Sequence, residues 1–349
     1  MDIKLVNYNL TKDLKYSNLT IKFSLNKDNK NKKEISSQQF HSITLSTLIN
    51  SLRRVIITQI PIYAFAPELI QIDKNISILN NDQYKLKFSQ IPILNIISDL
   101  FYINKINDYK EFAVSKEINK YKKIEIYINQ KNTDLFPKNI TTNDIVYIID
   151  DKVTTSPYNK NFPILLTKLR QNEELRCKLI GVIGIGEQNN IWSSVSNIFF
   201  YNKENDYFLN INSNGQLTEF EIINKACQNI IYNLENTKNK IHLYLDTLNK
   251  INQENNLDKI KLTLPDITIG NLINDQLQNN ENIKNSGICR PTYLQNDVII
   301  NIEFSDIILS KFENAKKNNE IIKAVFDNCI NNIIETYKIL NLKIQKLNK

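Results

Sequence analysis

One short sequence occurs twice in the chain, far apart. Residues 43–50 read ITLSTLIN and residues 267–274 read ITIGNLIN, so five of the eight positions are identical. Both octets open a helical pattern, and two helices with the same apolar stripe can bury these stripes against each other across a pseudo-two-fold axis. Each buried Leu or Ile contributes roughly 1.5–3 kcal/mol, so such a pairing would be hard to dissociate. A chance match in a chain rich in Ile and Asn is the alternative.

The first octet begins a stretch, residues 43–60, in which apolar residues recur every three or four positions. Pro61 ends this predicted helix. Its buried face is predicted from Leu45, Leu48, Ile49, Leu52, Val55, Ile56 and Ile60. Arg53 and Arg54 lie off this face. Arginine can donate paired hydrogen bonds to carboxylates and backbone oxygens, so the two are either solvated helix charges or contacts to a partner.

The second octet begins a helix predicted over residues 267–278, with Asp266 as its N-cap. We expect this helix to pair with the first through Ile269, Gly270, Leu272, Ile273 and Leu277. Gly270 has no side chain, and we expect it to let the two helices cross closely.

The remaining patterns predict an α+β fold. Residues 62–198 are rich in strand patterns. Thr218 and Glu221 form a capping box at the start of a long helix that reaches about residue 248. Further predicted elements are a strand over 207–211, a polar linker over 249–257, a strand over 259–264, turn material around Gly287 and Pro291, a strand over 297–304 and a final helix over 312–346.

Composition excludes several classes of protein. The chain has 349 residues, which predicts two domains, with one or three as alternatives. Its 42% of hydrophobic residues is typical of a globular protein, and its net charge of +7 is well short of a dense basic DNA-binding stripe. The four cysteines contain no CxxC pair, so we expect reduced thiols and no zinc site. The N-terminal residues lack the apolar core of a signal peptide. The longest apolar stretch, residues 55–67, is too short to cross a membrane.

Two features could suggest ligand binding, and each is better explained as structural. Gly181, Gly184 and Gly186 have the order GxxGxG, which is wrong for a dinucleotide-binding loop, and no Gly-Lys-Ser/Thr follows. Tight backbone geometry at a strand end is the preferred interpretation. Asp150 and Asp151 lack a third carboxylate nearby, and we expect them in a solvated turn.

The histidines and the single tryptophan give no catalytic pattern either. His41 and His242 are distant in sequence and predict neither a catalytic triad nor a zinc site. Trp192 is predicted to be a packing residue. We therefore expect no catalytic residue, no cofactor and no metal site in this chain.

Larger segments resemble a known family. Residues 49–65, INSLRRVIITQIPIYAF, resemble the signature helix of α-type RNA polymerase subunits, which comprise bacterial α, archaeal D and the third-largest subunit of eukaryotic polymerase II. Residues 75–93 keep the Asn, Ser, Leu, Asp and Ile-Pro landmarks of the next family motif but lack its His-Arg pair, near Lys85–Phe88. Residues 165–200 and 207–234 resemble later parts of that subunit, with matching positions at Lys168, Leu169, Arg170, Glu174, Leu175, Gly184, Ile185, Gly186 and Trp192.

The C-terminal segment resembles the small partner of that subunit, archaeal L or the eukaryotic eleventh subunit. Residues 266–273, DITIGNLI, match its helix motif, and residues 286–291, SGICRP, match its turn. In the family the two subunits form the heterodimer that nucleates polymerase assembly. A chain with both halves is similar to the polymerase subunits of large DNA viruses such as poxviruses and their relatives.

The resemblance implies a domain organisation. We expect a first dimerisation module from residues 1–65 and 200–248, a strand-rich insert domain over 66–199 and a second module over 258–349. The two modules would pair inside the chain as a pseudo-heterodimer. The family's cysteine cluster for zinc or an iron–sulfur centre is lacking, so neither cofactor is expected.

The resemblance also implies a function. The chain would be a non-catalytic assembly subunit of a multisubunit DNA-directed RNA polymerase, with Arg53 and Arg54 contacting the second-largest, β-like subunit. Other expected partners are the largest, β′-like subunit and other small subunits, with DNA reached only through the complex. The expected location is intracellular: the host cytoplasm or virion for a viral protein, otherwise the nucleus or cytoplasm. A stand-alone nucleic-acid-binding regulator and a nucleotide-handling enzyme are the alternatives.

Overall fold

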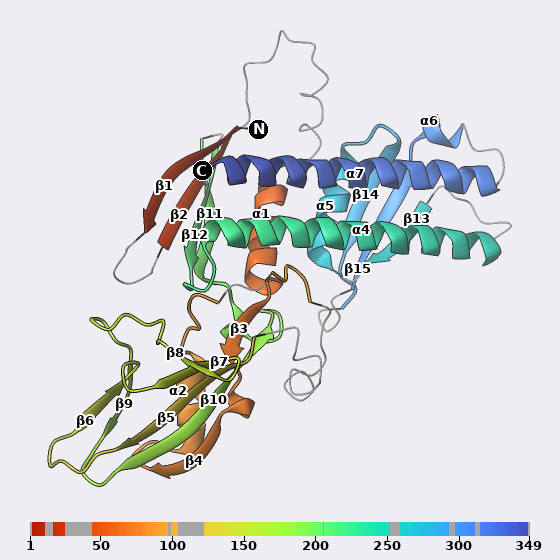
Figure 1. The fold of residues 1–349 in the computed structure, drawn as a ribbon. Coiled ribbons are helices and arrows are strands. Elements are labelled where there is room, and N and C mark those ends of the chain that lie inside the picture. Colours follow the sequence, from red (N-terminus) through yellow and green to blue (C-terminus); the bar gives the residue numbers. More distant parts are fainter. Residues whose placement is uncertain are drawn as a thin grey trace.

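The computed structural model describes residues 2–10, 17–24, 44–96, 99–103, 122–204, 206–251, 259–264, 266–292, 297–310 and 315–347. Within them the chain has a mixed α/β architecture with several antiparallel sheets and two long helices (Figure 1). The expected α+β class is confirmed at this level. His41 and the polar segment 26–33 lie outside the described residues.

A four-stranded sheet joins the N-terminal strands to strands from the middle of the chain. Its order is β1 (Asp2–Leu10), β2 (Ser17–Ser24), β12 (Asp206–Ser213) and β11 (Val195–Lys203). Alternate side chains of β2 are buried, as strand geometry requires. Helices α1 (Leu45–Thr58) and α4 (Glu219–Ile251) contact this sheet. The predicted boundary at residue 200 falls inside β11.

A three-stranded sheet is formed by the C-terminal part of the chain. Its order is β13 (Lys259–Leu264), β15 (Val298–Phe304) and β14 (Ile283–Cys289), with α5 (Ile267–Gln278) packed on it and α6 (Asp306–Leu309) and α7 (Ala315–Leu347) following. The prediction of a turn at Gly287 is wrong, because Gly287 lies in strand β14, opposite Asn301 of β15. Residues 249–251, which were expected to begin the linker, instead belong to α4, which continues to Ile251.

The strand-rich middle of the chain forms a separate six-stranded sheet. It contains β3 (Ile62–Phe65), β10 (Glu174–Gly184), β5 (Ile124–Lys131), β7 (Val146–Ile149) and β8 (Lys152–Thr154) in order, with β4 (Gln71–Ile76) also paired to β10. Beside it lie a two-stranded sheet, β6 (Lys138–Thr141) with β9 (Leu165–Leu169), and α2 (Asn81–Ser89). Two short 3₁₀ helices, Pro67–Leu69 and Asn190–Trp192, flank these strands. Helix α2 was not predicted.

The apolar side chains form two large clusters. One contains residues of the four-stranded sheet, the three-stranded sheet and helices α1, α4, α5 and α7. The other contains residues of the six-stranded sheet and α2. Strand β3 lies between them, because Ile62 and Ala64 belong to the first cluster while Tyr63 and Phe65 belong to the second. Its alternating side chains therefore join the two clusters through one strand.

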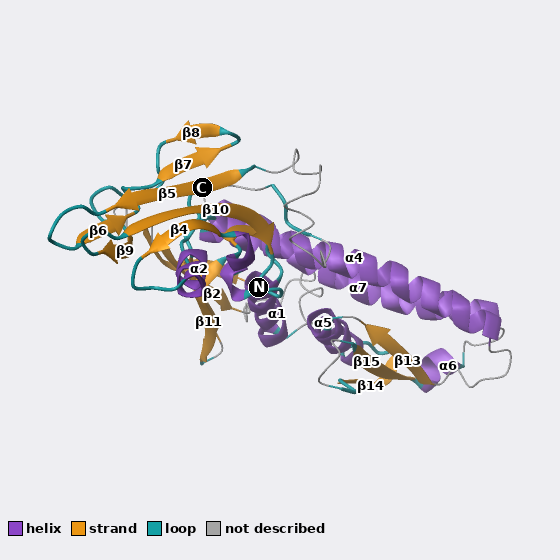
Figure 2. Cartoon of the chain, turned by 90° about the horizontal axis from the view of Figure 1, so that it is seen from below, coloured by secondary structure: helices purple, strands orange, loops and turns teal. Residues whose placement is uncertain are grey.

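The two long helices, α4 and α7, lie side by side in both views (Figures 1 and 2). Two contacts show that they run antiparallel. Lys323 of α7 contacts Asp246 of α4 at 2.6 Å, and Asn341 of α7 contacts Asn224 of α4 at 2.8 Å. Higher numbers on one helix thus face lower numbers on the other. The far end of α4 reaches the three-stranded sheet, where the Tyr244 hydroxyl donates to the carbonyl of Lys261 at 2.9 Å. The far end of α7 reaches β1.

Candidate subunit-docking site

The two octet helices, α1 and α5, contact each other in antiparallel orientation. At one end the backbone N–H of Thr44 donates to Asp275 Oδ2 at 2.7 Å. At the other end Gln59 Nε2 donates to Asp266 Oδ2 at 2.9 Å. Asp266 also caps α5, because its Oδ1 accepts from the N–H of Thr268 at 2.7 Å. Polar contacts therefore fix both ends of the crossing.

The apolar stripes of the two helices are buried in the same cluster. This holds for nine of the residues predicted to pair: Leu45, Leu48, Ile49, Leu52, Ile56, Ile269, Leu272, Ile273 and Leu277. A stripe on one surface of each helix is what the periodicity predicted. The described structure thus brings together two segments more than 200 residues apart in the sequence.

Gly270 is buried, but it does not face α1. A methyl group added there would lie 2.8 Å from Ile288 Cδ1 and 3.0 Å from Val298 Cγ2. Both side chains belong to the three-stranded sheet. Our expectation that Gly270 lets the two helices cross closely is therefore wrong: the glycine lets α5 approach its own sheet.

Arg53 and Arg54 differ in their contacts. Arg53 is half-buried, and its Nε and one terminal nitrogen donate to Asn50 Oδ1 at 3.2 and 3.0 Å. Arg54 is exposed, and its Nε donates to Thr268 Oγ1 of α5 at 3.1 Å. Arg53 is thus oriented by its own helix, whereas Arg54 links the two octet helices.

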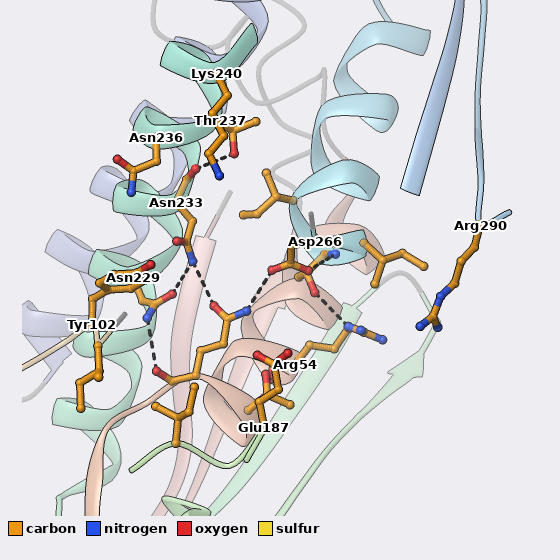
Figure 3. A pocket seen from close by; sticks show the side chains of 17 residues that line it. Arg54, Tyr102, Glu187, Asn229, Asn233, Asn236, Thr237, Lys240, Asp266 and Arg290 are labelled. Atoms are coloured by element: carbon orange, nitrogen blue, oxygen red, sulfur yellow. Dashed lines mark hydrogen bonds between the residues drawn. The ribbon is translucent and has the colours of Figure 1, made fainter. Parts of the chain in front are cut away.

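A cavity of about 720 Å³ opens where the end of α1, the middle of α4 and the start of α5 meet (Figure 3). Its lining includes three basic side chains, Arg54, Lys240 and Arg290, and two acidic ones, Glu187 and Asp266. Such a mixed polar surface suits hydrogen-bonded protein contacts better than an apolar ligand.

Gln59 is the centre of a hydrogen-bond network beside this cavity. Its side-chain amide donates to Asp266, and its Oε1 accepts from Asn233 Nδ2 at 3.0 Å. Its backbone carbonyl accepts from Asn229 Nδ2 at 3.3 Å. One residue therefore connects α1, α4 and α5, and its hydrogen bonds are among the dashed lines that reach Asn229, Asn233 and Asp266 in Figure 3. Sequence reasoning missed it; the only available signal was a glutamine inside the apolar stretch 55–67.

A buried lysine holds another segment against α4. Lys225 is only 8% exposed, and its Nζ donates to the carbonyl of Leu100 at 2.8 Å. Burial lowers its pKa, while the nearby charges of Asp99 and Glu221 act in the opposite direction. The charge is tolerated because a carbonyl oxygen accepts from it.

The glycines that could suggest a phosphate loop are explained by packing. Gly184 faces the indole ring of Trp192, which is buried and donates from Nε1 to the carbonyl of Val182 at 3.1 Å. Gly186 faces the carbonyl of Ile57 at the end of α1. A side chain at either position would collide with these groups.

The other chemical candidates also have structural contacts. Asp150 and Asp151 lie in a turn at positive φ, and Lys123 contacts both of them. His242 Nε2 lies 2.8 Å from Asp327 Oδ1, which joins α4 to α7. The described ranges contain no cluster of three or more His, Cys, Asp or Glu side chains that could hold a metal ion. In the same ranges no helix combines the length and apolar character needed to cross a membrane.

Comparison with known proteins identifies the family. The model of the RNA polymerase Rpb3/Rpb11 dimerisation domain matches residues 44–234, more than half of the chain. A protein of Acanthamoeba polyphaga mimivirus, assigned as a DNA-directed RNA polymerase subunit, is 26% identical over 321 residues, which cover 84% of this chain and 85% of that protein.

Cellular relatives match a smaller share of the chain. The DNA-directed RNA polymerase II subunit rpb3 of Dictyostelium discoideum is 26% identical over 179 residues, which are 50% of this chain and 56% of that subunit. Subunit 3 of the DNA-directed RNA polymerases II, IV and V of Arabidopsis thaliana is 25% identical over 188 residues, with shares of 51% and 56%. The region matched by the family model, residues 44–234, contains α1, the six-stranded sheet, β11, β12 and the first half of α4. Because this match covers more than half of the chain, the chain belongs to the family of the RNA polymerase Rpb3/Rpb11 dimerisation domain.

Proposed function

We propose that the chain is an assembly subunit of a DNA-directed RNA polymerase in which two modules pair internally as a pseudo-heterodimer. The first module comprises β1, β2, α1, β3, β11, β12 and α4, and the second comprises β13, α5, β14, β15, α6 and α7. The other strands of the six-stranded sheet, the small sheet and α2 form the insert domain, to which β3 is paired through β10. The paired modules present one platform to the large catalytic subunits, and the chain contributes contacts rather than chemistry.

The shared apolar cluster is the observation that carries this proposal. Residues of both modules bury their side chains in one cluster, as in obligate subunit interfaces, which are more apolar than transient ones. Each long helix contacts the sheet of the other module: the end of α4 contacts β13, and the end of α7 contacts β1. Each module therefore lacks part of its core without the other.

The docking surface for the second-largest subunit is proposed at Arg53, Arg54 and the adjoining cavity. Arg54 uses its Nε internally, and among the described residues its two terminal nitrogens have no hydrogen-bond partner. These nitrogens can donate to a carboxylate or to carbonyl oxygens of a partner. Arg53 is oriented by Asn50, so its guanidinium is held in place before binding.

Variants of Arg54 test this surface. Arg54→Ala in the full-length chain should weaken co-purification with the β-like subunit from the native source by about tenfold or more, as for loss of a charged interface anchor. Thr268→Val is the matched control, because it removes the internal partner of Arg54 but keeps the guanidinium. Retained binding in the Thr268 variant and lost binding in the Arg54 variant would separate docking from internal pairing. Equal loss in both would contradict the docking role.

Family membership supports a polymerase subunit and gives no support to a stand-alone nucleic-acid-binding regulator. Under this proposal the partners are the second-largest and largest subunits and other small subunits, and DNA is reached only through the complex. The chain acts where the polymerase acts, inside the cell. Robust nucleotide turnover by the isolated chain would contradict the proposal.

A further inference from the structure

Two neighbouring apolar side chains are the most exposed large hydrophobic residues among those described. Leu135 is 78% exposed and Phe136 is 81% exposed. Both lie in the connection between β5 and β6, at the end of the insert domain that points away from the long helices (Figure 1). This end is remote from α1 and the cavity, so the surface proposed above does not use it.

The connection is held in shape by one buried residue. Asn132 is 1% exposed, and its Nδ2 donates to the carbonyls of Phe136 and Leu169, both at 2.9 Å. Its Oδ1 accepts from the N–H of Asp134 at 3.0 Å. Its own backbone N–H donates to the carbonyl of Glu173 at 3.0 Å. The loop that carries Leu135 and Phe136 is thereby fixed to the neighbouring β9–β10 connection.

This anchoring distinguishes the pair from ordinary exposed hydrophobic residues. Single exposed apolar side chains are common and need no explanation. Leu86 of α2, which is 63% exposed, is such a case. Two adjacent side chains on a loop fixed by a buried asparagine differ, because a preformed loop loses little conformational entropy on binding. Apolar anchors of this kind dominate the affinity of many protein interfaces.

The charges around the pair favour an acidic partner surface. Lys131 precedes the loop, Lys138 follows it, and Arg170 follows the anchored Leu169. Asp134 lies inside the loop, and Glu173 of the β9–β10 connection accepts from the backbone N–H of Arg170 at 2.7 Å, so the three basic residues outnumber two carboxylates. Basic groups around an apolar centre complement a pocket with carboxylates at its rim.

We propose that Leu135 and Phe136 form a preformed docking knob that inserts into an apolar pocket with an acidic rim on another protein of the polymerase. This proposal rests on the proposed function in one respect, which is that the partner is another subunit of the polymerase. It adds a contact at the far end of the insert domain that the α1 surface does not provide.

Photo-crosslinking from position 136 tests the knob. The full-length chain with benzoylphenylalanine in place of Phe136 is assembled into polymerase and purified from the native source. The expected product is a crosslink to one other polymerase polypeptide, at apolar residues flanked by Asp or Glu. Leu135→Ala in the same chain should reduce the crosslink yield by about tenfold, and Leu86→Ala should leave it unchanged.

Asn132→Ala keeps both apolar side chains and removes the anchor. A lower crosslink yield in this variant, with the thermal unfolding midpoint and co-purification retained, supports the role of preorganisation. If the unfolding midpoint of Asn132→Ala falls, the crosslink yield of Leu135→Ala is the test of the knob, because an exposed side chain can be removed without loss of stability.

Several outcomes would overturn the proposal. A chain that still assembles through Arg54 but gives no crosslink from position 136 would exclude the knob and leave the proposed function standing. A crosslink to a second copy of this chain would also exclude it. A third result would exclude the knob as well: the chain forms no protein crosslink but co-sediments with phosphatidylserine vesicles, and this co-sedimentation depends on Leu135 and Phe136. Failure of the chain to assemble into any polymerase would contradict both proposals.

Discussion

The hydroxyl of Tyr337 in α7 donates a hydrogen bond of 3.1 Å to the backbone carbonyl of Leu48 in α1. Tyr337 is completely buried, and burial raises its pKa well above the ordinary value. A buried hydroxyl requires a partner, and here the partner lies in the other octet-bearing half of the chain. The last helix is therefore positioned directly against the first.

Tyr337→Phe tests this link. The change removes the hydroxyl but keeps the ring, so the free energy of unfolding should fall by about 1 kcal/mol. Chemical denaturation monitored by circular dichroism measures the change. The matched control is Tyr244→Phe, because the Tyr244 hydroxyl also donates to a carbonyl across the two halves but is exposed, so water can replace the bond. An equal loss in both variants would show that burial of the Tyr337 bond is not what matters.

A chain ending at residue 256 should be unable to remain a soluble monomer. It lacks α5 and α7, so the stripe of α1 and much of the inner face of α4 would be exposed. Light scattering after size-exclusion chromatography should show self-association or insolubility. A soluble, monomeric 1–256 fragment would count against internal pairing of the two modules.

Gly184→Ala should disturb the packing of Trp192. The added methyl group meets the indole ring, which is itself buried and hydrogen-bonded, so we expect a loss of roughly 1–3 kcal/mol in the free energy of unfolding. Trp192 is the only tryptophan, so its fluorescence reports the change directly. Gly287→Ala is the control, because nothing lies within 4 Å of an added methyl group there. Similar effects at both positions would contradict the packing argument.

The six-stranded sheet should lose stability in acid. Burial raises the pKa of Glu125, but hydrogen bonds from Lys178 and Tyr127 and the charges of Lys178 and Lys123 outweigh burial and hold the pKa below its ordinary value. A hydrogen bond from Lys74 likewise lowers the pKa of Glu174. Such carboxylates contribute their full stability above the unfolded pKa, and this contribution is lost as the pH falls through the lower folded pKa.

Glu125→Gln tests the acid dependence. Unfolding measured from pH 7 downward should show a lower stability at pH 7 and a weaker loss below about pH 4.5, the ordinary carboxyl value, because glutamine does not titrate. Glu235→Gln, on the exposed side of α4, is the control and should leave the free energy of unfolding at pH 7 almost unchanged. An unchanged acid profile in the Glu125 variant would exclude this carboxylate as a cause.

Thiol labelling should distinguish one cysteine from the other three. Cys289 is exposed, whereas Cys177, Cys227 and Cys329 are buried. Burial raises the pKa of the Cys177 thiol to about 12 and also raises the pKa of Cys227 and Cys329. Because the thiolate is the reactive form, a disulfide reagent at pH 8 should label one thiol per folded chain and four after unfolding. Rapid labelling of more than one thiol in the folded chain would contradict the burial.

Local chemistry determined many element boundaries from the sequence alone. Strand β13 and helix α5 begin and end where they were predicted, and Asp266 caps the start of the helix through its own side chain. The capping box of Thr218 and Glu221 is likewise present at the start of α4. Helix α2 carried the same kind of signal, a capping box of Asn80 and Gln83, which our reading of this strand-rich region overlooked.

Only the tertiary structure decided what these elements contact. The sequence determined that two stripes of one pattern exist and therefore that both must be buried, since apolar periodicity is a local property. It did not determine that Gly270 faces its own sheet, that Arg54 bonds Thr268, or that Gln59 joins three helices. These contacts join residues far apart in the chain, and their partners are selected by packing and by the need to satisfy buried polar groups, which no single segment records.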